Sequence, residues 1–230
     1  NGNDLVLQWA NTRSLGWGSN GNGQLGNNGV LDSAVPVPVV RTGVLAGKTL
    51  LSLSTGGNHS IALAADGTVT AWGNNSYGQL GNSNTTDSLV PVSVTATGTL
   101  LSKTVIAIAA GQYHNLALCS DGTLAAWGYN FYGQLGNNST TQSSAPVAVN
   151  KTGVLSGKTI ISIAAGTYTS FALCSDGTLA SWGYNGNGEL GNGGTGYSQV
   201  PVTVDNSGVL SGKTISSVIA GAFQNFALCS

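Results

Sequence analysis

The 230-residue chain contains no methionine, three cysteines and very few charged residues. Only 7 % of its residues are charged, whereas about a quarter are charged in typical soluble proteins. The seven cations are scattered among eight acidic residues, so no basic patch is available to neutralise a phosphate backbone. We therefore expect no nucleic-acid partner.

Long hydrophobic runs are missing as well. No apolar stretch approaches the roughly 20 residues that a membrane-spanning helix needs, so we expect no membrane span. The absence of methionine predicts a processed chain or a segment excised from a longer one. Since charge is scarce, Gly, Ser, Thr and Asn must supply the polar surface, and this composition favours an extracellular or cell-surface location.

The cysteines do not form a disulfide framework. They are odd in number, and they stand 55 residues apart at Cys119, Cys174 and Cys229, so they occupy one position of a repeated unit. Equivalent sites on sheets stacked about 10 Å apart lie beyond the Cα separation that a disulfide tolerates. We expect buried structural thiols and no metal site.

The main feature that is present is an internal repeat. The pair Trp-Gly recurs every 55 residues, which predicts supersecondary units that must stack to bury their apolar faces. Residues 1–10 are left over as an extra strand in the phase of the C-terminal strand. The tryptophans are Trp17, Trp72, Trp127 and Trp182, and the repeats cover 11–65, 66–120, 121–175 and 176–230.

Each repeat has the pattern of an antiparallel sheet with four strands. In one copy the apolar run 105–110 predicts a strand buried on both faces, and Ser120-Asp121-Gly122 predicts a hairpin turn. Pro146 places the last strand at the sheet edge, as do Pro91 and Pro201 in theirs, because proline lacks the ladder donor. Almost no helix is expected. The predicted strands are 105–110, 115–119, 123–127 and 145–149.

Two recurring motifs carry a family resemblance. Gly-Asn-Asn-Ser-Tyr-Gly-Gln-Leu-Gly at 73–81 and Gly-Tyr-Asn-Phe-Tyr-Gly-Gln-Leu-Gly at 128–136 resemble the first signature of the regulator-of-chromosome-condensation repeat. Leu-Ser-Thr-Gly-Gly-Asn-His-Ser-Ile-Ala-Leu at 53–63 resembles the second. The similarity covers residues 11–230. It implies a β-propeller whose loops bind proteins, and the low charge suggests a bacterial-type secreted or surface member.

The predicted fold is therefore an all-β propeller of four-stranded antiparallel blades. Four 55-residue repeats are visible, and the resemblance implies a larger ring of about seven blades. The chain would then be part of that ring or of a multi-chain assembly. A closed ring of four blades is the weaker alternative.

Motifs that suggest cofactor chemistry lack the required context. Gly21-x-Gly23-x-x-Gly26 and its counterpart at 186–191 match a dinucleotide fingerprint, but no helix follows either of them. The Gly-Lys-Thr triplets at 47–49, 157–159 and 212–214 are spaced one residue short of a phosphate loop. They lead into strands, so they predict turns that each carry an exposed lysine. We expect no cofactor.

No catalytic group stands out from its repeat equivalents. The family's histidine position reads His59, His114, Thr169 and Gln224 in successive repeats, which indicates a hydrogen-bonding core residue rather than a catalytic or metal-binding one. We therefore expect no enzyme activity. An enzyme that uses an axial channel would need a pocket with residues unique to one blade.

Aromatic residues in polar loops are the candidate binding residues. Their amphipathic rings suit protein or glycan contacts, but they would equally serve to fill space between blades. We expect a non-catalytic binding or structural module of a secreted or cell-surface protein that contacts another protein, a glycan or copies of itself. The alternative is an intracellular regulator resembling a guanine nucleotide exchange factor for a small GTPase. The candidates are Tyr77, Phe131, Tyr132 and Tyr197.

Overall fold

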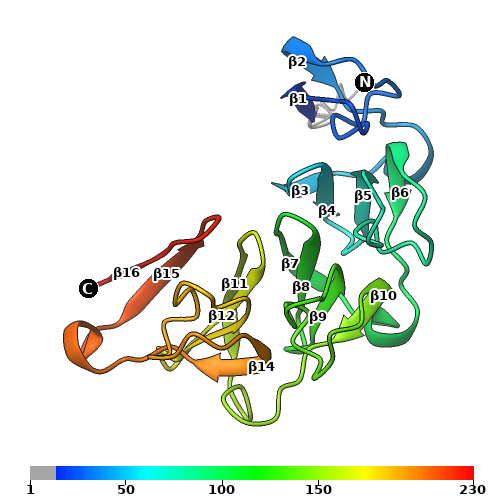
Figure 1. Cartoon of the computed structure of the whole chain (residues 1–230). Helices are drawn as coiled ribbons and strands as arrows, with labels where there is room; N and C mark the ends of the chain where they lie inside the picture. The colour runs from blue at the N-terminus through cyan, green and yellow to red at the C-terminus, as the bar shows by residue number, and fades with distance from the viewer. Residues whose placement is uncertain (1–13) are drawn as a thin grey trace, which may run out of the picture.

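The computed structural model describes residues 14–230 and shows β-sheets arranged as blades along an open arc (Figure 1). Three blades are complete, and each is an antiparallel sheet of four strands in chain order, which confirms the predicted fold class. The first comprises β3 (Leu50–Thr55), β4 (His59–Ala64), β5 (Val69–Gly73) and β6 (Ser88–Ser93). The second comprises β7 (Val105–Ala110), β8 (His114–Cys119), β9 (Leu124–Gly128) and β10 (Ser143–Ala148). The third comprises β11 (Ile160–Ala165), β12 (Thr169–Cys174), β13 (Leu179–Gly183) and β14 (Ser198–Thr203).

Each end of the arc carries half a blade. β1 (Leu15–Gly18) pairs with β2 (Ser33–Pro38), and β15 (Ile215–Ala220) pairs with β16 (Asn225–Cys229). By repeat position the first pair are third and fourth strands, and the second pair are first and second strands. The extra strand predicted within residues 1–10 lies outside the described residues.

Helical structure in residues 14–230 is limited to three short 3₁₀ turns, as expected from the sequence. Each turn joins the last strand of one unit to the first strand of the next, and Leu45 and Leu100 anchor two of them in the core. None of the helical segments in the described part of the chain is long and apolar enough to cross a membrane. The turns are η1 (Gly43–Leu45), η2 (Gly98–Leu100) and η3 (Gly208–Leu210).

The strand order confirms which strands lie at the sheet edges. Pro91, Pro146 and Pro201 lie on β6, β10 and β14, the outermost strands of their sheets. The prediction for the first strands was wrong in part, because Ile106 on β7 is 53 % exposed. β3, β7, β11 and β15 contact one another in succession along the concave side of the arc, where one side of each strand has no layer over it (Figure 1).

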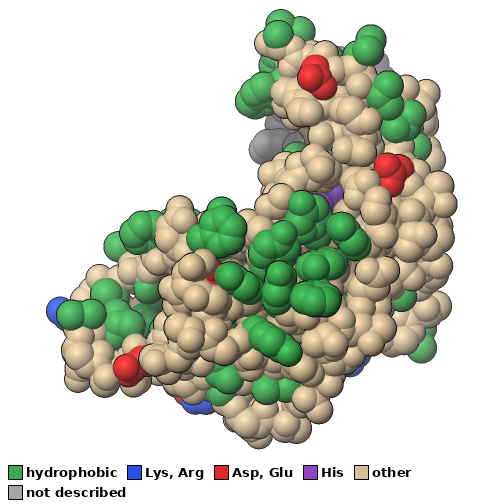
Figure 2. All heavy atoms as spheres, in the orientation of Figure 1, with side chains coloured by type: hydrophobic (Ala, Val, Ile, Leu, Met, Phe, Trp, Pro, Cys, Tyr) green, Lys and Arg blue, Asp and Glu red, His purple; other side chains and the backbone are tan. Residues whose placement is uncertain are grey.

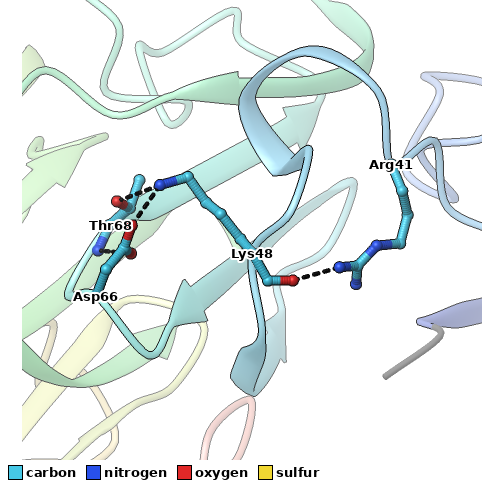
Figure 3. A network of polar contacts seen from close by, with 4 residues as sticks. All are labelled: Arg41, Lys48, Asp66 and Thr68. Atoms are coloured by element: carbon cyan, nitrogen blue, oxygen red, sulfur yellow. Dashed lines mark hydrogen bonds and ion pairs between the residues drawn. The ribbon is translucent and has the colours of Figure 1, made fainter. Parts of the chain in front are cut away.

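The Gly-Lys-Thr turns differ from the prediction of a simply exposed lysine. Figure 3 shows that Lys48 reaches the hairpin between β4 and β5, where its ammonium group contacts Asp66 and the Thr68 hydroxyl. Arg41 in turn donates to the Lys48 carbonyl. The hydrogen bond from Lys48 lowers the pKa of Asp66 to about 2. Since these pairs are partly solvated, each contributes little to stability.

A repeated junction holds each blade to the one before it. The backbone carbonyl of Gln79 accepts the indole N–H of Trp127 at 3.0 Å and the side-chain amide of Asn115 at 2.8 Å. A Cβ at Gly81 would lie 2.8 Å from the Trp127 indole nitrogen, so only glycine allows the ring this close. We call this arrangement the inter-blade junction. Trp72 and Trp182 form the same contact with Gln24 and Gln134.

Two histidines extend the junctions and are buried. His59 Nε2 lies 2.8 Å from Asn115 Oδ1, and His114 Nε2 lies 2.9 Å from Ser170 Oγ. Because the Ser170 hydroxyl donates to the Gln134 carbonyl, His114 must donate to Ser170. Burial lowers the pKa of His59 to about 4, and burial together with the neighbouring His59 lowers that of His114 to about 3. Both rings are therefore neutral structural donors near pH 7.

We predict that Trp127→Ala lowers the free energy of unfolding by about 3 to 5 kcal/mol, because it empties a fully buried site between blades. Trp127→Phe should cost about 1 kcal/mol, since it mainly removes the bond to the Gln79 carbonyl. Urea denaturation measures both changes. Tyr197→Ala is the control, because that ring is 55 % exposed. A loss below 1 kcal/mol for Trp127→Ala would contradict the junction.

Acidification should destabilise the fold between about pH 6.5 and pH 4. The unfolded histidines titrate near 6.5 and the folded ones near 4 and 3, so the unfolded chain binds more protons in this window. Each histidine should cost about 1.4 kcal/mol per pH unit below 6.5. His114→Thr, which introduces the residue that Thr169 supplies in the next repeat, should make the slope shallower. Urea midpoints at several pH values test this, and an unchanged slope would contradict it.

Candidate functional site

The sheet topology divides the loops between two faces of the arc. In each complete blade, the loop between the first two strands and the loop between the last two strands emerge on one face. The central hairpin, with its aspartate and lysine pair, emerges on the other. The first face carries the loop between β7 and β8 with Tyr113, and the loop between β9 and β10 with Phe131 and Tyr132. We call it the aromatic face.

Seven aromatic rings form one connected group on this face, which we call the tyrosine cluster. Tyr77 and Tyr129 have ring centroids 4.8 Å apart, as do Tyr132 and Tyr184, so the contacts cross from blade to blade. Figure 2 shows hydrophobic side chains gathered over the centre of the arc, with Lys and Arg only at its margins. The members are Tyr77, Tyr113, Tyr129, Phe131, Tyr132, Tyr168 and Tyr184.

Three of the four candidate residues come together in this cluster. Phe131 is 63 % exposed and Tyr77 is 36 % exposed, while Tyr132 packs edge-on against Tyr168. Tyr197 is also exposed, but it makes no ring contact with the cluster. The rings thus both fill space between blades and present aromatic surface to solvent. A binding role for these residues stays a prediction.

Four members of the cluster were missed in the sequence. Tyr113 and Tyr168 occupy one repeat position, and Tyr129 and Tyr184 occupy another. The first complete blade carries asparagine at both positions. Comparison of equivalent loop positions, rather than of ring-rich stretches, would have found all four. The asparagines are Asn58 and Asn74.

Buried amides hold the aromatic loops in place. Asn130 is fully buried, and its side chain bonds the carbonyls of Ser139 and Thr141 and the backbone N–H of Leu135. The neighbouring Phe131 and Tyr132 are thereby presented on a fixed loop. Since this loop is preorganised, little conformational entropy is lost when a partner binds the two rings.

Tyr184 owes its position to a glycine. A Cβ at Gly186 would lie 2.1 Å from the Tyr184 hydroxyl oxygen, so only glycine leaves room for the ring to fold over this loop. The equivalent position one blade earlier is Phe131, which stacks on Tyr129. The cluster therefore continues across both blades with different local chemistry.

The cluster is uncharged at neutral pH. Desolvation raises the pKa of Tyr129 and of Tyr168, and the neighbouring tyrosines raise both further. Among residues 14–230 no group of three His, Cys, Asp or Glu side chains is placed to hold a metal ion. The arrangement can stack on apolar groups, peptide planes or sugar rings, and its hydroxyls can form hydrogen bonds.

The cavity on the concave side offers no ionisable group. Its volume is about 220 Å³, and it is lined by the glycines and alanines that join the first two strands of each unit, with Thr55, Gln112 and Thr167. Cys119 and Cys174 are buried elsewhere, and burial raises the pKa of both thiols. They are structural thiols, as the sequence predicts. Cys229 is only partly buried, because it lies on the half-blade of β15 and β16.

Residues 2–227 match the RCC1-like domain. The chain belongs to the RCC1-like domain family. It is 35 % identical over 175 residues to the ultraviolet-B receptor UVR8 of Arabidopsis thaliana, covering 76 % of this chain and 38 % of the receptor. It is 34 % identical over 189 residues to the probable E3 ubiquitin-protein ligase HERC4 of Homo sapiens, covering 82 % of this chain and 17 % of the ligase.

Solved structures share the fold of this RCC1-like chain. Human WBSCR16 superposes with a TM-score of 0.80 and 26 % identity, covering 95 % of this chain and 53 % of that one. Yeast RCC1 (Prp20), bound to Kap60, gives 0.77 and 23 %, covering 94 % of this chain and 49 % of that one. This chain therefore spans about half the length of these propellers.

We predict that at least two tyrosines of the native RCC1-like chain ionise above the ordinary pH of about 10. Their folded pKa is raised, so the unfolded chain loses these protons first and stability falls as the pH rises past 10. Ultraviolet absorbance during alkaline titration measures phenolate formation, with the urea-unfolded chain as reference. Tyr129→Asn should remove one of the late transitions. A native titration that coincides with the unfolded one would contradict the cluster.

Proposed function

We propose that this RCC1-like chain is a non-catalytic protein-binding module and that the tyrosine cluster is its contact surface. The observation that carries this proposal is the connection of seven rings from three blades on one face, with Phe131 63 % exposed at the surface. Tyrosine is enriched at protein interfaces because it offers a large, rigid area with a polar tip.

The chemistry of the cluster selects a neutral, partly apolar partner segment. Its rings carry no net charge, and asparagine, glutamine and glycine surround them. A proline, an aliphatic side chain or another aromatic ring would stack on Phe131 and Tyr132, while the hydroxyls would bond the partner's backbone. The similar yeast protein binds proteins, since its structures describe Kap60, Gsp1p and histones. That similarity supports a protein partner for this chain.

A non-catalytic role agrees with the placement of the reactive groups. The histidines are buried, neutral and committed to the inter-blade junctions. The Cys119 and Cys174 thiols are buried with raised pKa values, so little reactive thiolate forms near pH 7. Neither group reaches the aromatic face as a nucleophile.

Localisation and partner class beyond protein remain part of the proposal. The low charge favours a secreted or cell-surface setting, in which adhesion, glycan contact or self-association would use the same face. The second candidate, an exchange factor for a small GTPase, would need a charged, asymmetric face. Three of the seven cations instead pair with hairpin aspartates, which speaks against that alternative.

The proposal can be tested with a displayed library of random peptides. Peptides selected on the chain should contain aromatic, aliphatic or proline residues, and calorimetry should measure their binding. The triple substitution Tyr113→Asn, Tyr129→Asn and Tyr132→Asn should weaken binding by at least about tenfold, a loss of about 1.4 kcal/mol. Asn58, Asn74 and Asn187 stand at the same loop positions in other repeats, so the fold should tolerate these changes.

The matched control is Tyr197→Gln, because Gln142 is its repeat equivalent and Tyr197 lies outside the cluster. It should bind selected peptides as the unaltered chain does. Equal affinity of the triple variant would overturn the proposal. A glycan array and a nucleotide-release assay on small GTPases, run with the same variants, test the two other partner classes.

A further inference from the structure

One inter-blade junction is half filled. The carbonyl of Glu189 accepts the side-chain amide of Asn225 at 2.9 Å, as the Gln79 carbonyl accepts that of Asn115. At the filled junctions the second donor is a tryptophan 48 residues further on. That position falls beyond Ser230, and no described residue donates an indole to Glu189. We call the space beside Gly191 the Gly191 slot.

The Gly191 slot has the lining of a filled junction. Trp182 packs in one cluster with Leu124, Val149 and Leu155. The equivalents of these residues line a cavity of about 480 Å³ beside Gly191. A Cβ at Gly191 would meet only Val204 at 3.2 Å, whereas one at Gly136 would strike the Trp182 ring. The lining residues are Leu179, Val204 and Leu210.

The opposite end of the arc presents an indole without a slot. Trp17 on β1 is 64 % exposed, whereas Trp72 is 2 % exposed and Trp127 is fully buried. The edge strand β16 is exposed as well, with Phe226 at 67 % and Leu228 at 66 %. One end therefore offers the third and fourth strands of a blade with their tryptophan, and the other offers the first and second strands with an empty slot.

The two ends of one chain do not meet. Figure 1 shows the half-blade of β1 and β2 and that of β15 and β16 at opposite ends of the arc. Its curvature matches that of a propeller about twice its length, because the superposition on human WBSCR16 covers 95 % of this chain and 53 % of that one. The complementary half-blade must then come from another chain.

We propose that two copies of this chain join head to tail at both ends and close one ring. Trp17 of each copy enters the Gly191 slot of the other, where its indole N–H donates to the Glu189 carbonyl. β16 pairs with β1 of the other copy, so four strands complete a blade. Three complete blades and two half-blades amount to four blades per chain, so two chains give eight, within the range of known propellers.

The filled blades supply the register of the new strand pair. On β8 and β9, Asn115 lies opposite Trp127 and Ala117 lies opposite Ala125. The same register between copies places Asn225 opposite Trp17 and Ala227 opposite Leu15. Two cysteines at this last pair of positions should therefore come within disulfide distance, since opposite Cβ atoms in an antiparallel pair lie about 4.5 to 5.5 Å apart.

Native mass spectrometry and sedimentation of the 230-residue chain test the association. We expect a dimer with no larger species, and Trp17→Ala should raise its dissociation constant at least tenfold. Phe131→Ala is the matched control, because Phe131 is 63 % exposed and lies on the aromatic face. It should leave the dimer unchanged. A monomer at every concentration, or equal dimerisation of Trp17→Ala, would overturn the proposal.

Disulfide trapping separates a second copy from closure within one chain. In a Cys229→Ser background, Leu15→Cys and Ala227→Cys are made on separate chains, mixed and oxidised. A covalent dimer that forms only in the mixture is the expected result. A Val35→Cys chain in place of Leu15→Cys should give none, since Val35 lies on β2. No product in the mixture, or a cross-link only when both cysteines share one chain, would overturn the proposal.

Discussion

The bond from a tryptophan indole to a backbone carbonyl of the preceding blade is the contact on which the rest of the structure depends. A carbonyl such as that of Gln79 takes two donors from the next blade, and a glycine two residues later lets the ring lie against the turn. Each sheet is hydrophobic on both faces and cannot bury them alone. The junction fixes the rotation between neighbours, and this rotation in turn determines the curvature of the arc and the faces on which the loops emerge.

The tyrosine cluster is a consequence of that rotation. Its rings come from loops 55 residues apart, such as those of Tyr113 and Tyr168, and they touch because adjacent blades repeat with a small angle between them. Charge plays little part here. The Lys48 and Asp66 type of pair lies on the opposite face, where it braces hairpins and leaves the aromatic face neutral. A rigid, uncharged surface of this kind suits a protein partner with apolar side chains.

Much of the fold was readable from periodicity. The strands, the hairpins at Asp121-Gly122 and the edge position of Pro146 follow from local patterns, and the structure confirms them. The exposure of Ile106 did not follow, because an apolar run does not reveal whether another layer covers it. The lysine turns were wrong in part for a similar reason, since the partner of Lys48 lies on a hairpin 18 residues away. In the cluster, Phe131 and Tyr132 were found, while Tyr129 and Tyr184 were missed.

The sequence by itself determined the repeating unit, its four strands and the need for copies to stack, because hydrophobic period and turn residues act over short distances along the chain. It also set the low charge and the tryptophan spacing. Only the tertiary structure decided which aromatic rings meet and which carbonyl receives each indole. It also decided that the ends of the arc stand apart, with Trp17 exposed at one and the Gly191 slot at the other. Those outcomes depend on the angle between packed sheets, which many contacts set together and no single motif encodes.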